Sequence, residues 1–197
     1  MFKIISVLVL ACGSAFAAFS FWPSSSVPAT LTTGVRIQYS TSTTVGGSES
    51  VNQRTTRIQS VTGDWQEMTD YFNVDGSLHH SATIIAISGR GTFKLAPKAQ
   101  NLLLIGSRPE GYRPTFDVAA AIRSPAFVGE ATIAGHRAIG LKNGDTITYQ
   151  AADLDGAYLK IESPGTTRVA TGVELGSFSV DPLPDWPIVD TTVPQPR

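Results

Sequence analysis

Three histidines, at positions 79, 80 and 136, are the side chains best suited to bind a metal ion or to transfer a proton near neutral pH. His79 and His80 are adjacent, and adjacent residues of a strand point to opposite faces of a sheet. The two imidazoles therefore do not reach one metal ion from a regular strand. His136 has no H-x-x-x-H or His-Asp spacing around it. We predict no metal site and no cofactor.

Serines near turns are the candidate nucleophiles for acyl transfer, but Ser107, Ser124 and Ser163 all lie outside a G-x-S-x-G elbow. The glycines around Arg90 form neither a G-x-G-x-x-G nor a Walker pattern, so phosphate binding is not predicted. Two carboxylates that converge as acid and base would make a hydrolase, and this remains a weaker alternative. The candidate carboxylates, whose simpler interpretation is surface solvation, are Glu110, Asp117, Glu130, Asp153 and Asp155. We predict a protein that is not an enzyme.

The composition sets limits on partners and on secondary structure. Of 197 residues, 42% are hydrophobic and only 16% are charged, and the net charge is -1, so the chain lacks the basic patch expected for nucleic-acid binding. The 18 glycines and 12 prolines, together with many Thr and Ser, disfavour helices and favour strands joined by tight turns. We therefore predict a mainly β protein without a nucleic-acid partner.

Residues 1–17 are typical of a signal peptide, because Lys3 precedes an apolar run over 4–11 and the segment ends in an A-x-A cleavage pattern. The apolar run is too short to span a bilayer, so we expect no transmembrane helix after processing. Cys12, the only cysteine, gives an alternative in which the protein is a lipoprotein anchored through that residue. The expected location is periplasmic or secreted, in a bacterium. Residues 18–30 follow as an extended arm.

The remaining chain divides into an antiparallel β domain over 31–181 and a proline-rich tail over 182–197. Alternating hydrophobicity and the Asp75-Gly76 and Asn143-Gly144 pairs predict strands and hairpins, with type I′ geometry for both turns. One short helix is predicted over 116–122. The predicted strands cover residues 34–43, 50–61, 65–74, 78–87, 92–95, 131–141, 146–151, 158–163 and 167–180. We leave the apolar run 102–105 unassigned because it is too short to assign by period.

Aromatic residues occur on nearly every predicted strand, as the core of a curved sheet requires. The predicted fold is a single curved antiparallel sheet or half-barrel with one short helix. Such a sheet, with little to cover its concave face, can leave an apolar ligand groove as the alternative to complete core packing. The residues predicted to bind the ligand are Ile85, Ile87, Leu103, Phe116, Ile133, Ile139 and Tyr149.

The second half of the chain resembles the closing strands of the LolA/LolB-like superfamily and related exported bacterial proteins, over residues 131–190. The segments that carry the resemblance are ATIAGHRAIG (131–140), TITYQAADL (146–154) and YLKIE (158–162). In the family a G-x-x-A strand is followed by a strand ending near Pro-Asp-Leu, where this chain has Ala152-Asp153-Leu154. The resemblance implies an incomplete antiparallel barrel whose concave face can hold acyl chains. The first half has no long amphipathic helix to plug it.

Together these features predict an exported, non-enzymatic binding protein that holds a lipid or an acylated partner, such as a lipoprotein, on the concave face of the sheet. The alternative is a structural or protein-interaction module of the cell envelope. In that case the arm and the proline-rich tail would contact an envelope protein.

Overall fold

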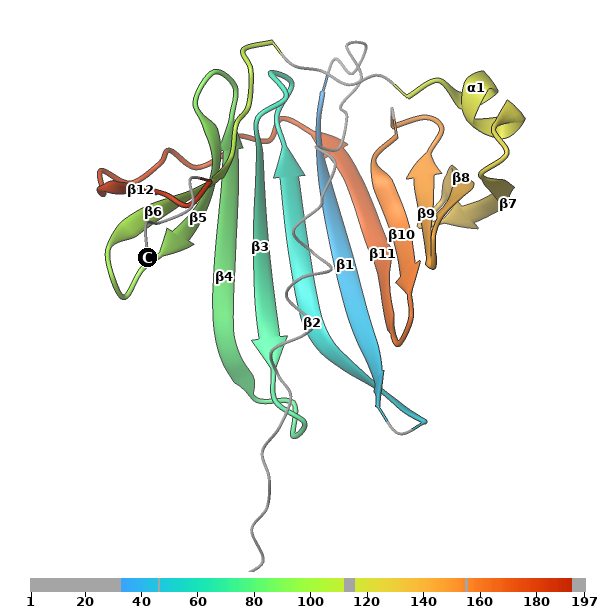
Figure 1. Cartoon of the computed structure of the whole chain (residues 1–197), viewed down its shortest axis with the longest axis horizontal. Helices are drawn as coiled ribbons and strands as arrows, with labels where there is room; N and C mark the ends of the chain where they lie inside the picture. Colours follow the sequence, from blue (N-terminus) through green and yellow to red (C-terminus); the bar gives the residue numbers. More distant parts are fainter. Residues whose placement is uncertain (1–32, 46, 112–115, 155, 193–197) are drawn as a thin grey trace, which may run out of the picture.

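Twelve strands form one continuous sheet in the order β12-β6-β5-β4-β3-β2-β1-β11-β10-β9-β8-β7. The computed structural model describes residues 33–45, 47–111, 116–154 and 156–192. Figure 1 shows an open, curved sheet whose two ends do not meet. The prediction of a mainly β, single curved sheet with one short helix is confirmed. The predicted signal peptide and arm, residues 1–30, lie outside the described residues.

Strand pairing is antiparallel throughout except at one edge, where β12 runs parallel to β6. The run at 102–105, which the sequence left unassigned, lies in β6. The elements are β1 (Gly34–Val45), β2 (Ser48–Gln59), β3 (Trp65–Phe72), β4 (Leu78–Ile87), β5 (Gly91–Ala96), β6 (Asn101–Gly106), α1 (Val118–Arg123), β7 (Phe127–Ile133), β8 (His136–Asn143), β9 (Thr146–Ala151), β10 (Tyr158–Ser163), β11 (Thr166–Gly176) and β12 (Ile188–Asp190).

The hairpin predicted at Asp75-Gly76 joins β3 to β4, but its turn is not the predicted type I′, because, of these two residues, only Gly76 has a positive φ. Gly76 has φ 80° and its amide donates to the Asn73 carbonyl at 2.9 Å, while the Asp75 carboxylate accepts from the Ser77 amide at 2.9 Å. The β8–β9 hairpin is also present, but its turn is not the predicted type I′. Asn143 pairs with Thr146, and of the turn residues only Gly144 has a positive φ, 59°.

One predicted strand is wrong, because residues 131–141 form a hairpin and not a single strand. The chain reverses between β7 and β8 at Ala134, with φ 49°, and Gly135, with φ 85°. Two consecutive positive φ angles are what a type I′ turn requires. Ala-Gly is not among the common sequences for this turn, because alanine occupies the left-handed region reluctantly. Tertiary packing of both strands decides the turn at this point.

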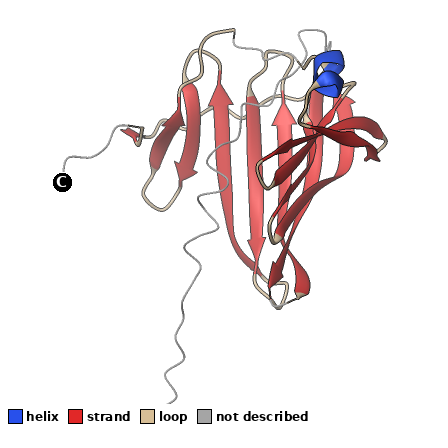
Figure 2. Ribbon diagram, turned by 45° about the vertical axis from the view of Figure 1, so that its right-hand side comes forward, coloured by secondary structure: helices blue, strands red, loops and turns tan. Residues whose placement is uncertain are grey.

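The main apolar core lies on the face of the sheet that carries Val35, Ile37 and Tyr39, which we call the inner face. Figure 2 shows the end of the sheet beneath the helix curling forward. This curl brings β7–β10 over β1 and β11, so that small and aliphatic side chains pack together. The buried members are Val35, Ile37, Tyr39, Ile133, Ala138, Ala151, Leu154, Ala157, Leu159 and Ala170.

A second buried group lies on the opposite, outer face, beneath residues 177–187, which we call the C-terminal segment. This segment leads from β11 across the sheet to β12 (Figure 1). The Gln66 side chain donates to the Asp181 carboxylate at 2.8 Å and accepts from the Asp181 amide at 2.9 Å. Ile85, paired with both Gln66 and Phe93, shares this face and is 1% exposed. Hydrogen bonds at Asp181 and at Pro187, whose carbonyl accepts from the Leu102 amide, therefore hold the C-terminal segment against the sheet.

Helix α1 is a single short element held by its N-cap. The Asp117 carboxylate accepts from the Ala120 amide at 2.8 Å, and the helix ends at Ser124, before Pro125. This agrees with the short helix predicted over 116–122. Among the described residues there is no helix long and apolar enough to cross a membrane.

Candidate ligand-binding site

The strand register separates the predicted ligand-binding residues of β4 and β6. Cross-strand pairing links Leu103 to Lys94, Lys94 to Ile84, and Ile84 to Glu67. Paired residues share a face of the sheet, and Glu67 lies on the inner face, so Leu103 lies there too. Ile85 and Ile87 alternate with Ile84 and therefore lie on the outer face. Of these predicted residues, only Leu103 faces the inner side of the sheet.

The remaining predicted residues lie at the curled end of the sheet. Ile133 belongs to the inner core, and Tyr149 packs against that core. Ile139 is fully buried, but it follows Ala138 of the core and so points to the opposite face. Phe116 is half-buried just before α1. The structure therefore does not bring the seven residues together on one surface.

What the inner face does bring together is a set of buried polar residues, which sequence reasoning did not identify. We call this set the polar band. It crosses β11, β1, β2 and β3 next to the apolar core. Its members, all 9% exposed or less, are Thr41, Thr55, Arg57, Gln59, Glu67, Thr69 and Arg168.

An ion cluster of Arg57, Glu67 and Arg168 forms the centre of the polar band. Arg168 Nη1 and Nη2 lie 3.1 and 3.0 Å from Glu67 Oε1 and Oε2, a bidentate arrangement. Arg57 Nη1 lies 3.4 Å from Glu67 Oε2. The three side chains are only 6 to 8% exposed. Charge-assisted bonds of this kind are the strong ones, and burial protects them from salt.

The ion cluster also spans the curvature of the sheet. Glu67 is on β3 and Arg168 on β11, and two strands, β2 and β1, lie between them. Three strand spacings amount to roughly 14 Å along a flat sheet. The two side chains reach each other because the inner face is concave, so this ion pair links two strands that are not neighbours in the sheet.

Aromatic rings surround the two guanidinium groups. The Arg168 guanidinium lies 4.0 Å from the centre of the Tyr39 ring, and the Arg57 guanidinium lies 4.0 Å from the Trp65 ring. The Tyr39 hydroxyl donates to the Tyr158 carbonyl at 2.8 Å. Within the described residues the buried Trp65 Nε1 has no hydrogen-bond partner. The cluster thus contains a donor that is still available.

Protonation states in the cluster follow from burial and from the opposed charges. Burial disfavours the charged form of Glu67, but the adjacent Arg168 and Arg57 outweigh it and hold the pKa of this carboxyl below its ordinary value. Burial lowers the pKa of Arg57 and raises that of Tyr39. At neutral pH the carboxylate is therefore ionised and Tyr39 keeps its proton.

The histidines make pairwise contacts. His136 Nδ1 lies 2.8 Å from Asp153 Oδ2, a pair whose spacing of 17 residues gave no signal in the sequence. His80 stacks on Tyr71 with 4.4 Å between ring centres, and His79 meets His80 edge-on at 4.9 Å. Among the described residues, no group of three or more His, Cys, Asp or Glu is placed to hold a metal ion.

Most of the candidate catalytic carboxylates have structural partners of their own. Asp117 caps α1, Glu130 forms two bonds of 2.7 Å with Arg137, and Asp153 contacts His136. These carboxylates lie on exposed positions of the helix and of the β7–β9 region. None of these contacts joins two of the carboxylates as an acid and base pair.

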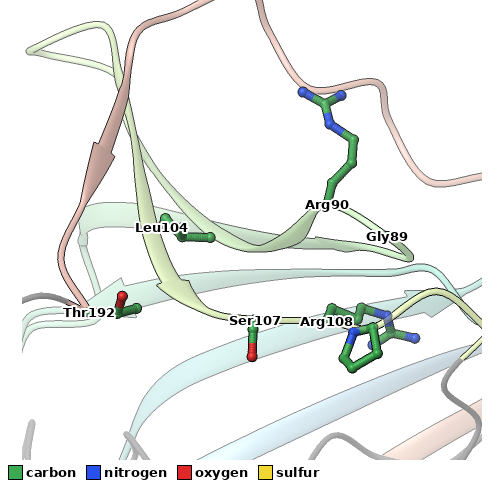
Figure 3. A pocket seen from close by; sticks show the side chains of 7 residues that line it. Gly89, Arg90, Leu104, Ser107, Arg108 and Thr192 are labelled. Atoms are coloured by element: carbon green, nitrogen blue, oxygen red, sulfur yellow. The ribbon is translucent and has the colours of Figure 1, made fainter.

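Two surface hollows lie away from the polar band. The first, of about 380 Å³, is shown in Figure 3, where Arg90 and Arg108 point in different directions and Ser107 and Thr192 stand apart. The Arg108 guanidinium instead donates to the Gly63 carbonyl. The second hollow, of about 470 Å³, lies beside Lys142, Asp145 and Glu162 at hairpin ends. Neither hollow includes the predicted ligand-binding residues.

No protein-family model matches the chain, and no curated protein matches it significantly. Similar solved structures include a DUF1329 family protein from Desulfovibrio piger, 8% identical over 75% of this chain and 87% of that one, with a TM-score of 0.22. A domain assigned to outer membrane lipoprotein sorting from Vibrio parahaemolyticus is 7% identical over 72% and 85%, with a TM-score of 0.24. A LolA superfamily protein from Nitrosomonas europaea is 12% identical over 83% and 90%, with a TM-score of 0.25. The suspected LolA-like relationship is consistent with these neighbours, but TM-scores this low support no argument about function.

Proposed function

We propose that this protein is an exported, non-enzymatic binding protein that holds the acyl chain of a lipid or of an acylated protein on the inner face of its sheet. The observation that carries the proposal is the row of paired residues Glu67, Ile84, Lys94 and Leu103. This row runs from the buried ion cluster toward the β6 edge. Ile84 and Leu103 remain half-buried there, although both are aliphatic.

The arrangement of layers supports this assignment. In the curled half of the sheet, β7–β10 cover the inner face and bury its side chains. The one described helix contacts β7 and β8, at the far end from β4–β6. Half-buried apolar side chains on a concave surface are the usual lining of a site for an apolar ligand. We name the apolar members of this surface, Tyr71, Ala82, Ile84 and Leu103, the apolar row; Lys94 lies between Ile84 and Leu103.

Binding and not catalysis is supported by how the titratable groups are used. The buried carboxylate of Glu67 is held ionised between two guanidinium groups, which suits it to structure and recognition and not to proton transfer. Of the candidate carboxylates, Asp117, Glu130 and Asp153 have the partners described above, and Asp155 lies outside the described residues.

Binding of a fluorescent fatty acid to the purified protein tests the proposal. We expect saturable binding with one ligand per chain, weakened by Leu103→Gln because a polar amide in the apolar row disfavours the acyl chain. Met68→Gln is the matched control, because Met68 is 46% exposed on the outer face of β3. Circular dichroism checks that both variants fold. Equal loss of binding in both variants, or no saturable binding by the folded protein, would rule the proposal out.

The second candidate function, an interaction module of the cell envelope, is favoured by the exposed edges of the sheet. Val128 on β7 is 46% exposed and Ile188 on β12 is 53% exposed. An edge strand with apolar side chains can pair with a strand of another protein. This candidate predicts that replacing Val128 by Lys abolishes a complex with an envelope partner and leaves fatty-acid binding unchanged. Pull-down from envelope extracts followed by reconstitution with the purified partner measures it.

A further inference from the structure

We infer that the ligand is an anionic amphiphile whose oxyanion head, a carboxylate or a phosphate, binds at the ion cluster while its acyl chain lies along the apolar row. This inference rests on the proposed function and adds the chemical class of the head group. It is carried by three observations: the composition of the ion cluster, the Trp65 donor and the continuity of the cluster with the apolar row.

The ion cluster has the chemistry of an oxyanion site. The described residues place two guanidinium groups around one carboxylate, each only 6 to 8% exposed. A guanidinium presents several N–H donors in a planar fork that matches carboxylate and phosphate oxygens. In a low-dielectric site such bonds are stronger than in water. When an oxyanion head group binds beside Glu67, each guanidinium donates hydrogen bonds both to the Glu67 carboxylate and to the head group.

Trp65 adds an independent indication that an acceptor atom belongs in this place. Its side chain is on the inner face, stacked against Arg57, and the residue is 7% exposed. Within the described residues its buried Nε1 donates to no acceptor. A buried donor without an acceptor is costly, so an oxygen-bearing head group is favoured here over a hydrocarbon end.

The cluster leads directly into the apolar row. Glu67 is paired with Ile84, and the cross-strand pairing continues past Lys94 to Leu103, three strand spacings or roughly 14 Å from Glu67. Two half-buried tyrosines, Tyr71 and Tyr158, lie within electrostatic reach of the cluster. Burial, and to a smaller extent the charge of Glu67, raises the pKa of Tyr71. Burial also raises the pKa of Tyr158, although the nearby charge of Arg57 acts to lower it.

Comparing ligands that differ in one part tests the inference. Isothermal titration with palmitate supplies head and chain together, hexadecanol supplies the chain without charge, and acetate or inorganic phosphate supplies an anion without a chain. We expect palmitate to bind about tenfold to a hundredfold more tightly than hexadecanol, as charged hydrogen bonds imply. Acetate and phosphate should bind far more weakly than palmitate.

Two variants locate the effect. Arg57→Met should remove the preference for palmitate over hexadecanol and leave Glu67 in its bidentate pair with Arg168. Arg54→Met is the matched control, because Arg54 lies on the same strand but faces outward and exposed. If Arg57→Met does not fold, Trp65→Phe serves in its place, since it keeps the ring and removes only the donor, and it should reduce the preference about threefold or more.

The possible outcomes distinguish the inference about the anionic head group from the proposed function. If hexadecanol and palmitate bind equally well, the anionic head is wrong while the proposed function stands. If the free anions bind as tightly as palmitate, the site takes an anion without a chain and the amphiphile is excluded. If neither palmitate nor hexadecanol binds to the folded protein, the proposed function itself fails. An unchanged preference in a folded Arg57→Met or Trp65→Phe protein would contradict the placement of the head group.

Discussion

The two halves of the inner face are built from opposite kinds of residue. At the curled end, Ile37, Ala138 and Leu159 belong to an apolar core that the sheet closes over itself. Next to it, the polar band buries Arg57, Glu67 and other hydrogen-bonding side chains to a similar extent. Close packing of side chains is enough to stabilise the apolar half, whereas each buried polar group of the polar half also needs a hydrogen-bond or ion-pair partner. Such a costly arrangement on a concave face is more readily explained by recognition than by stability, since buried ion pairs contribute little net stability.

The largest difference between the halves should follow from removing one partner of the ion cluster. Arg168→Met deletes the bidentate partner of Glu67 and leaves that carboxylate 3.4 Å from Arg57. We expect a loss of about 3–5 kcal/mol in the free energy of unfolding, because a buried charge loses its main compensation. Urea denaturation followed by tryptophan fluorescence measures it. A loss below about 1 kcal/mol would show that the polar band is not a cooperative unit.

The pH dependence of stability distinguishes the halves next. The folded-state pKa of Glu67 is lower than its ordinary value of 4.5, so its ionisation stabilises the fold above that pH. This contribution is lost as the pH falls below 4.5 toward the depressed folded value, because the unfolded chain takes up the proton more readily. Urea midpoints measured between pH 7 and pH 3 should fall for the wild-type protein. In Glu67→Gln the slope should be smaller.

Leu159→Ala is the matched control for the apolar half. Leu159 is fully buried in the inner core, so the variant should lose about 2–5 kcal/mol at every pH. Its decline between pH 7 and pH 3 should parallel that of the wild type. If Glu67→Gln and Leu159→Ala show the same pH slope, Glu67 is not the group that titrates.

The smallest effect should come from the outer face. Gln66→Ala removes both bonds between this side chain and Asp181, and so loosens the C-terminal segment. We expect a loss of about 1–2 kcal/mol, as for two hydrogen bonds, with ligand binding on the inner face unchanged. Hydrogen exchange should show faster exchange at Leu102, whose amide donates to the Pro187 carbonyl at 2.9 Å. An unchanged exchange rate of the Leu102 amide would show that the bonds between Gln66 and Asp181 do not hold the C-terminal segment in place.

Local sequence signals predicted most strands. The alternation of Val35, Ile37 and Tyr39 located β1, and Asp75-Gly76 located the β3–β4 hairpin. They missed the turn at Ala134-Gly135, where packing between strands overrides a sequence that is poor for the turn. Local patterns also gave no warning that the chain before the proline-rich tail is bonded to β3 through Gln66 and Asp181, because that contact joins parts of the chain far apart in sequence.

The site was harder to predict than the fold, for a physical reason. Hydrophobic residues were the natural candidates for an apolar site, but alternation alone does not say which face of a strand is inner. Ile85 and Ile87 were assigned to the wrong side of β4 relative to Leu103, since only the register across β3 to β6 fixes the faces. The polar band was missed because Arg57 and Arg168 resemble surface residues until curvature brings Glu67 between them.

Photochemical labelling tests most directly whether the inner face holds an acyl chain. The full chain is irradiated with a diazirine-bearing palmitate, and the labelled peptides are mapped by mass spectrometry. The structure predicts saturable labelling, competed by palmitate, in peptides that contain Ile84 and Leu103 of the apolar row. Labelling confined to the outer-face residue Met68, to the edge strands β7 and β12, or not competed by palmitate would contradict it.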